Sequence, residues 1–194
     1  MSKIVHRIDG SASHHGSFIR ELSDQVIDQL HATKVVTRDL ASTPVPQIDE
    51  NGLAASFTPA DARTPAQKEA LILPDTLIED VMEADTLVIG VPIYNFGDPA
   101  AVKAWSDHAC RAGKAFQYSK EGPKGLLHGK RALLFMVPSR TEIGSEIDFA
   151  INYMQHVLSF IGIANVDGVA ANKTVGNADV AMTETRSQIE ALAA

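Results

Sequence analysis

Hydroxyl side chains and two histidines are concentrated near the start of the chain, in residues 9–17 (Asp-Gly-Ser-Ala-Ser-His-His-Gly-Ser). This stretch follows an apolar segment and precedes an amphipathic one, so it is expected to join a strand to the beginning of a helix. Free backbone N–H groups and the helix dipole favour an anion at such a place. Ser11, Ser13 and Ser17 can add hydroxyl hydrogen bonds, and His15 can donate another. A phosphate site and a polar turn with a serine helix cap are equally open interpretations.

Two other kinds of site are not supported by this stretch. It lacks the Gly-Lys-Ser/Thr ending of a Walker loop and the spacing of a GxGxxG loop. The pair His14-His15 could suggest a metal, but adjacent side chains point in different directions, and no cysteine or carboxylate cluster accompanies them. We therefore expect no metal site.

A second candidate for ligand contact is residues 92–99, Pro-Ile-Tyr-Asn-Phe-Gly-Asp-Pro. The prolines at both ends stiffen the segment, and the remaining N–H groups can point at a planar ring. Tyr94 and Phe96 could pack on such a ring. The alternative is an aromatic corner that closes the core.

Five apolar segments alternate with amphipathic ones, which predicts a parallel sheet with helices on both faces. A single domain spanning 1–194 is expected. In such sheets, ligands bind beyond the carboxyl ends of the strands. The loops at 9–16, 92–99 and 138–145 are therefore the candidate site. The expected strands are 4–8, 34–40, 86–91, 131–137 and 166–170; the expected helices begin at 17, 67, 100, 146 and 179, with a long irregular stretch over 41–65.

Composition excludes several classes of partner and location. The net charge of -7 argues against binding to a nucleic acid. No apolar run approaches the ~20 residues of a membrane-spanning helix, so no membrane association is expected. Charged residues near the start interrupt any signal-peptide core. The single cysteine, Cys110, cannot form an intrachain disulfide, which favours a cytoplasmic location.

A series of motifs across the chain resembles the FMN-dependent NADH-azoreductase family, also described as NADH:quinone oxidoreductases. The resemblance implies a flavodoxin-like α/β fold, a doubly wound five-stranded parallel sheet in the order 2-1-3-4-5, and a homodimer. It extends over nearly the whole chain. The motifs that carry it are Pro92-Ile-Tyr-Asn-Phe96, Lys103-Ala-Trp105, Asp107, Arg111-Ala-Gly113, Phe116, Tyr118, Gly122-Pro123, Gly125-Leu126 and Phe160-Ile-Gly162.

The resemblance also implies a role for particular residues. Ser11 and the segment His15, Gly16 and Ser17 would hold the FMN phosphate. The segment Pro92, Ile93, Tyr94, Asn95 and Phe96 would bind the isoalloxazine ring. Tyr118 and Phe160 would line the substrate pocket, partly across the dimer interface.

The chain departs from the family pattern at two places. His15 stands where the family usually has a serine. The family's Ser-Arg-Gly-Gly after the fourth strand is replaced by Val137, Pro138, Ser139, Arg140, Thr141 and Glu142. Matching by residue type selects Ser139 and Arg140, whereas matching by distance to Phe160 selects residues 137–140, and both alignments remain open. Arg140 could stabilise negative charge on reduced flavin, or form a surface salt bridge.

Three functions are compatible with these observations. The first is an enzyme that uses NADH or NADPH to reduce quinones or azo compounds by ping-pong hydride transfer, with FMN supplying the chemistry. The second is a flavodoxin-type electron carrier, and the third is a non-catalytic member of the fold. The aromatic residues of the expected substrate pocket and the long stretch at 41–65 favour the enzyme.

Overall fold

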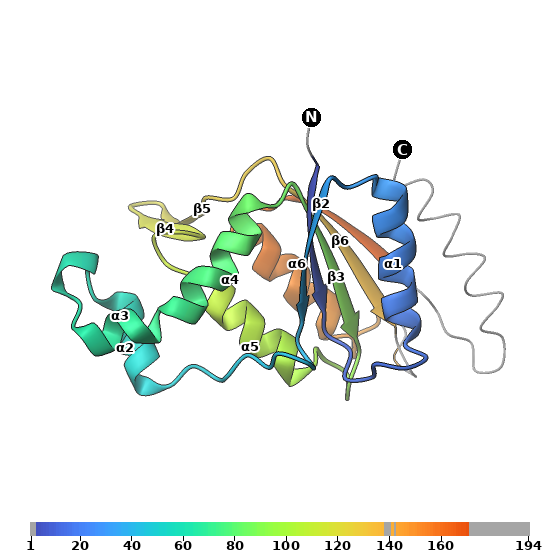
Figure 1. The fold of residues 1–194 in the computed structure, drawn as a ribbon, viewed down its shortest axis with the longest axis horizontal. Coiled ribbons are helices and arrows are strands. Elements are labelled where there is room, and N and C mark those ends of the chain that lie inside the picture. Colours follow the sequence, from blue (N-terminus) through green and yellow to red (C-terminus); the bar gives the residue numbers. More distant parts are fainter. Residues whose placement is uncertain (1–2, 138–140, 142, 171–194) are drawn as a thin grey trace.

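The computed structural model describes residues 3–137, 141 and 143–170, and its centre is one five-stranded parallel sheet (Figure 1). The strand order is β2-β1-β3-β6-β7, and every neighbouring pair is parallel. The predicted α/β fold with a five-stranded parallel sheet is confirmed. The strands are β1 (Ile4–Asp9), β2 (Lys34–Asp39), β3 (Thr86–Pro92), β6 (Arg131–Val137) and β7 (Asn165–Ala170).

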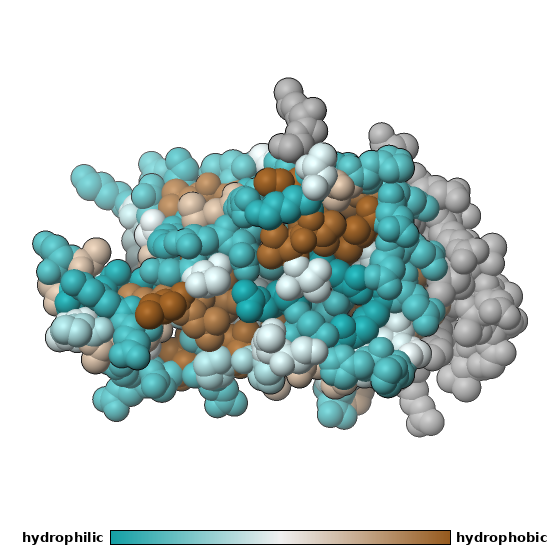
Figure 2. Space-filling view, in the orientation of Figure 1, coloured by the Kyte–Doolittle hydropathy of each residue, from teal (hydrophilic) through white to brown (hydrophobic). Residues whose placement is uncertain are grey.

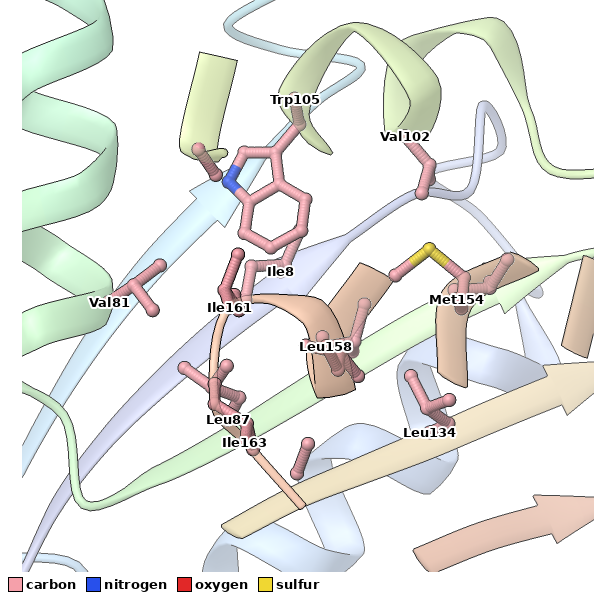
Figure 3. Close-up of a cluster of buried hydrophobic side chains, with 14 of the residues drawn as sticks. Ile8, Val81, Leu87, Val102, Trp105, Leu134, Met154, Leu158, Ile161 and Ile163 are labelled. Atoms are coloured by element: carbon pink, nitrogen blue, oxygen red, sulfur yellow. The ribbon is translucent and has the colours of Figure 1, made fainter. Parts of the chain in front are cut away.

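Helices cover both faces of this sheet, because its central strands are apolar on both sides. Every residue of β3 is buried. Helix α1 (Phe18–Leu30) packs on one face. The other face carries α4 (Ile72–Glu83), α5 (Ala100–Ala109) and α6 (Ala150–Phe160). Trp105 of α5 and Leu158 of α6 lie over the strand residues Ile8 and Leu87 in this second core (Figure 3).

The stretch 41–65 contains more regular structure than its four prolines, Pro44, Pro46, Pro59 and Pro65, suggested. It holds α2 (Glu50–Phe57), which begins after Asp49, whose carboxylate accepts a hydrogen bond from the Gly52 N–H at 2.7 Å. A 3₁₀ turn, Ala60–Ala62, follows. The expectation of an irregular loop over this whole range was therefore wrong, since a helix with an aspartate cap can form without strong apolar periodicity.

The single helix expected at 67–82 is divided into α3 (Pro65–Ala70) and α4. Pro74 explains the break, because its ring conflicts with the carbonyl four residues earlier, at Ala70, and its nitrogen cannot donate a hydrogen bond. Pro74 instead lies in the first turn of α4, where a proline is tolerated. Together, α2 and α3 form an arm that projects from the body of the molecule (Figure 1).

A short antiparallel hairpin, β4 (Phe116–Ser119) and β5 (Gly122–Gly125), lies between α5 and β6. Strands of four residues are too short to show a clear alternation, so the sequence did not indicate them. The helix expected at 179–192 lies outside the described residues. Among the described residues, no helix has the length and apolarity needed to cross a membrane.

Candidate functional site

Two loops meet at the carboxyl edge of the sheet: residues 10–17 after β1, and residues 93–99 after β3. The N–H of Ala12 in the first donates a hydrogen bond to the hydroxyl of Tyr94 in the second, at 3.3 Å. Both loops line a cavity of about 220 Å3. Gly10 allows the start of the first loop to lie close to β3 and α5, since a Cβ there would lie 2.4 Å from the Val102 side chain and 2.7 Å from the Gly90 carbonyl oxygen.

The loop after β1 brings its serines together at the start of α1. Ser17 is the residue before α1, but its hydroxyl makes no capping bond to the helix. It donates instead to the hydroxyl of Ser11 at 3.1 Å, and both side chains are buried. Within the described residues, no hydrogen bond occupies the N–H groups of Phe18 and Ile19. These donors and the positive end of the helix dipole remain able to bind an anion.

His15 and Gly16 lie on the exposed side of the same loop. Gly16 has a φ of +60°, and a Cβ added to it would have nothing within 4 Å. The Ser13 hydroxyl donates to the His15 carbonyl at 2.9 Å. His14 does not pair with His15 but lies 3.6 Å from the Asp39 carboxylate.

The loop after β3 forms a tight turn closed by two backbone hydrogen bonds between Tyr94 and Gly97, at 2.9 and 3.2 Å. Its central residues, Asn95 and Phe96, have φ values of +48° and +74°. A left-handed conformation at two successive non-glycine residues is uncommon, and such strain is frequent at functional sites. Tyr94 and Phe96 are 42% and 51% exposed, so these aromatic side chains do not belong to the hydrophobic core. The N–H groups of Asn95 and Phe96 have no partner among the described residues.

Pro92 and Ile93, the two residues before this turn, anchor it to the sheet. Pro92 ends β3, and Ile93 is buried in the main core. The Ile93 N–H donates to the carbonyl of Val137, the last residue of β6, at 3.3 Å. Pro138, Ser139 and Arg140 lie outside the described residues, so both alignments of this segment remain open.

A half-buried carboxyl group lies directly after the turn. One oxygen of Asp98 is buried and has no hydrogen-bond partner among the described residues. Burial, and secondly the neighbouring charge of Asp148, raise the pKa of Asp98 to about 7. Asp148 is itself buried and accepts hydrogen bonds from the N–H groups of Gly144, Ala150 and Ile151 at 2.9–3.1 Å.

Tyr118 and Phe160 lie apart from the two loops. Both contact Phe116, with ring centroids 5.5 Å and 4.5 Å away. In Figure 1 the hairpin that carries Tyr118 lies at the upper left, away from the lower ends of β1 and β3 where the two loops begin. Tyr118, which is 70% exposed, lines a second cavity of about 140 Å3 together with Phe57 of the arm. Figure 2 shows a patch of hydrophobic surface where this arm joins the body of the molecule. One chain therefore does not bring all the expected site residues together.

Two residues near the site were not found from the sequence. Arg20 contacts the loop after β1. Its position three residues after Ser17 is only a weak sequence signal that its side chain would reach this loop. No sequence pattern distinguishes Asp98 from an exposed turn residue, because its raised pKa depends on burial in the folded chain and on the charge of Asp148.

The comparisons with known proteins agree on one family. The family model described as "Flavodoxin-like fold" matches residues 3–193. The chain is 54% identical over 190 residues, 98% of both chains, to FMN-dependent NADH:quinone oxidoreductase 1 of Jannaschia sp. (strain CCS1). It is 41% identical, over the full length of both chains, to FMN-dependent NADH:quinone oxidoreductase of Erythrobacter litoralis (strain HTCC2594).

Solved structures show the same fold at lower sequence identity. The azoreductase from Bacillus anthracis str. Sterne has a TM-score of 0.86 and 23% identity, covering 100% of this chain and 99% of that one. An FMN-dependent NADH-azoreductase from Bacillus anthracis str. Ames Ancestor, in complex with FMN, has a TM-score of 0.83 and 19% identity, covering 100% and 98%. The sequence motifs, the sheet and these relatives together show that the chain belongs to the flavodoxin-like family of FMN-dependent NADH:quinone oxidoreductases.

Proposed function

We propose that this protein is an FMN-dependent oxidoreductase that reduces quinones, aromatic azo compounds or both with NADH or NADPH. The observation that carries the proposal is the strained, exposed turn at Asn95 and Phe96, whose Tyr94 contacts the serine-rich loop before α1. A flavin mononucleotide has a planar ring and a phosphate, which are the two chemical groups that these loops suit. The relatives named above support the same activity.

The residues at the carboxyl edge fit this cofactor. Ser11, Ser17 and the free N–H groups at the start of α1 would hold the phosphate, with His15 and Gly16 beside them. Tyr94, Asn95 and Phe96 would bind the ring through exposed side chains and unpartnered N–H groups. Pro92, Ile93 and Val137 would support that turn from the sheet, and residues 138–140 would complete the site. FMN bound there supplies the hydride transfer between the nicotinamide and the acceptor.

The steady-state kinetics test this function directly. A single binding site, beside the FMN ring held by the turn at Asn95 and Phe96, would receive first the nicotinamide and then the acceptor. The first product must therefore leave before the second substrate binds. With NADH varied at several concentrations of a benzoquinone, we expect parallel double-reciprocal lines. Intersecting lines would contradict a shared space. FMN-loaded protein that NADH fails to reduce without oxygen would indicate an electron carrier instead.

Replacing Ser17 with alanine is expected to weaken FMN binding. A hydrogen bond to a charged group contributes roughly 1.5–3 kcal/mol, so the dissociation constant should rise about ten- to hundredfold. Titration of the apoprotein with FMN measures this change. Ser23→Ala is the matched control, because the Ser23 hydroxyl is buried in the same helix and donates to the Ile19 carbonyl at 3.0 Å. Equal FMN affinities of Ser17→Ala and wild type would contradict the proposal that this loop binds the phosphate.

We also propose that the active form is a homodimer in which Tyr118 and Phe160 of one subunit face the carboxyl-edge loops of the other. The separation of these aromatic residues from the loops of their own chain supports this arrangement. Phe57, which is 70% exposed and lines the cavity beside Tyr118, would belong to the contact surface.

Phe57→Glu is therefore expected to weaken the dimer. Loss of a buried aromatic anchor costs about 2 kcal/mol or more, which corresponds to a dimer dissociation constant roughly thirtyfold higher. Light scattering at micromolar concentration measures the mass, and quinone reduction measures activity. Val35→Glu, on the exposed side of the edge strand β2, should leave both unchanged. A wild-type protein that is active as a stable monomer would overturn the proposal.

The finer features of the fold and location also belong to this proposal. With the two hairpin strands left out of the numbering, the order β2-β1-β3-β6-β7 supports the doubly wound arrangement 2-1-3-4-5 in a single domain. A pyridine-nucleotide substrate and a free Cys110 support a cytoplasmic protein.

A further inference from the structure

The guanidinium of Arg20, in the first turn of α1, lies under the loop that follows β1. Its side chain is only 13% exposed. The Arg20 Nε donates to the Ser13 carbonyl at 2.9 Å, and Nη2 donates to the Ser11 carbonyl at 2.8 Å. One side chain therefore fixes the backbone of the loop at two points, two residues apart.

Two carboxylates hold the guanidinium in this position. Asp39, at the end of β2, accepts from Nη1 at 3.0 Å and from Nη2 at 2.9 Å, and Asp9 accepts from Nη1 at 3.2 Å. The hydrogen bond from Arg20 holds the pKa of Asp39 well below its usual range. Burial raises the pKa of Asp9, although Arg7 and Arg20 oppose that shift. Asp39 is also anchored by the Ala41 N–H at 3.0 Å.

These contacts use every donor that Arg20 has. A guanidinium carries five N–H groups, and the five hydrogen bonds to Ser11, Ser13, Asp9 and Asp39 occupy them all. Asp9 and Asp39 also balance its charge. Arg20 thus has neither a free donor nor a free charge for a phosphate group, and any effect on a bound anion must act through the loop.

Because the peptide bond is planar, holding a carbonyl of the loop also fixes the direction of the N–H on the other side of the same peptide. In a trans peptide, the carbonyl and the next N–H point in opposite directions. Arg20 holds the Ser11 carbonyl, and on the other side of that peptide the Ala12 N–H donates to the Tyr94 hydroxyl. Arg20 likewise holds the Ser13 carbonyl, so the His14 N–H points away from the guanidinium. Among the described residues, the His14 N–H has no partner.

We propose that Arg20 is the positioning residue of the phosphate loop: by holding the Ser11 and Ser13 carbonyls, it keeps these oxygens away from the anion, leaves the Ala12 N–H bonded to Tyr94, and turns the unpartnered His14 N–H toward the ligand. This inference rests on the proposed FMN site. It makes Arg20 a determinant of affinity for the phosphate end of the cofactor, without contact between Arg20 and the phosphate.

Paired titrations with FMN and riboflavin test the proposal, because riboflavin has the same ring without the phosphate. For apoprotein carrying Arg20→Gln, we expect FMN to bind at least about tenfold more weakly than to wild type, and riboflavin to bind within about twofold. Arg20→Lys keeps the charge beside Asp9 and Asp39 but lacks the fork that reaches two carbonyls. It should therefore show the same selective loss, and it serves if the glutamine variant does not fold.

Arg7→Gln is the matched control. Arg7 also pairs with Asp9 and is equally enclosed, but it reaches no carbonyl of residues 10–17. It should change neither affinity by more than about twofold. Equal losses of FMN and riboflavin affinity in Arg20→Gln would indicate a merely structural role and overturn the inference, as would an equal FMN loss in Arg7→Gln. Wild-type protein that does not bind FMN would overturn the proposed function itself, whereas wild type and Arg20→Gln with the same FMN affinity would overturn only the role of Arg20.

Discussion

Replacing Asp98 with asparagine is expected to stabilise the protein above pH 7 and to have progressively less effect as the pH falls. Asp98 has a buried oxygen with no partner in the described part of the chain, and burial together with Asp148 raises its pKa from 3.8 to about 7. Between these values, the folded chain keeps a proton that the unfolded chain has released. The free energy of unfolding therefore decreases as the pH rises through this range, and the contribution is constant above pH 7.

The expected size of this effect is large for a single substitution. The pKa difference corresponds to roughly 4 kcal/mol for a fully enclosed group, and the partial exposure of Asp98 reduces this to roughly 2–3 kcal/mol. Asparagine resembles the protonated carboxyl in shape, and its amide can donate toward Asp148. Denaturant unfolding at several pH values between 5 and 8 measures the difference between the variant and wild type.

The control for this measurement is Asp61→Asn, at an exposed carboxylate in the 3₁₀ turn of the arm. It should leave the dependence of stability on pH unchanged. A difference between Asp98→Asn and wild type that is the same at pH 5 and pH 8 would show that Asp98 does not carry a raised pKa.

Gly125→Ala is expected to destabilise the protein by roughly 3 kcal/mol or more. A Cβ at Gly125 would lie 2.2 Å from the Gly162 nitrogen and 2.4 Å from the Ile161 carbonyl carbon. Both are backbone atoms, so they cannot move aside as a flexible side chain would. The N–H groups of Leu126 and Leu127, which donate to the Ile161 carbonyl at 3.1 and 2.9 Å, would be pulled out of position.

The consequence extends to the proposed substrate pocket. This backbone contact fastens the hairpin to the end of α6, where the Phe116 and Phe160 rings meet. Thermal or denaturant unfolding measures the loss of stability. Gly168→Ala is the control, since its Cβ would lie 3.6 Å from the Ile151 side chain, an ordinary contact. Equal stabilities of the two variants would contradict the close approach of the hairpin to α6.

Much of the fold can be predicted from local patterns in the sequence. The continuous apolar run at 86–91 indicates a strand covered on both faces, and β3 is buried throughout. The spacing of Phe18, Leu22, Val26 and Leu30 indicates one apolar helix face, and all four are buried in α1. The alternation of such segments also indicates that the loops after β1 and β3 reach the same edge of the sheet. These features depend on residues close together in the chain, which is why the sequence alone determines them.

The detailed chemistry of the candidate site depends on contacts between distant segments. Arg20 reaches Asp39 only because β2 lies beside β1, and the φ values of Asn95 and Phe96 accompany a hydrogen bond from the Phe149 N–H to the Phe96 carbonyl at 3.0 Å. The raised pKa of Asp98 arises from burial and from the charge of Asp148, 50 residues later in the chain. Side-chain periodicity carries no information about such pairings, because burial, strain and charge balance are set by the neighbours that the assembled sheet supplies. The sequence alone thus determined the five-stranded parallel sheet, α1 and the edge where the two loops meet, whereas only the tertiary structure decided the arm, the β4–β5 hairpin and which groups hold those loops in shape.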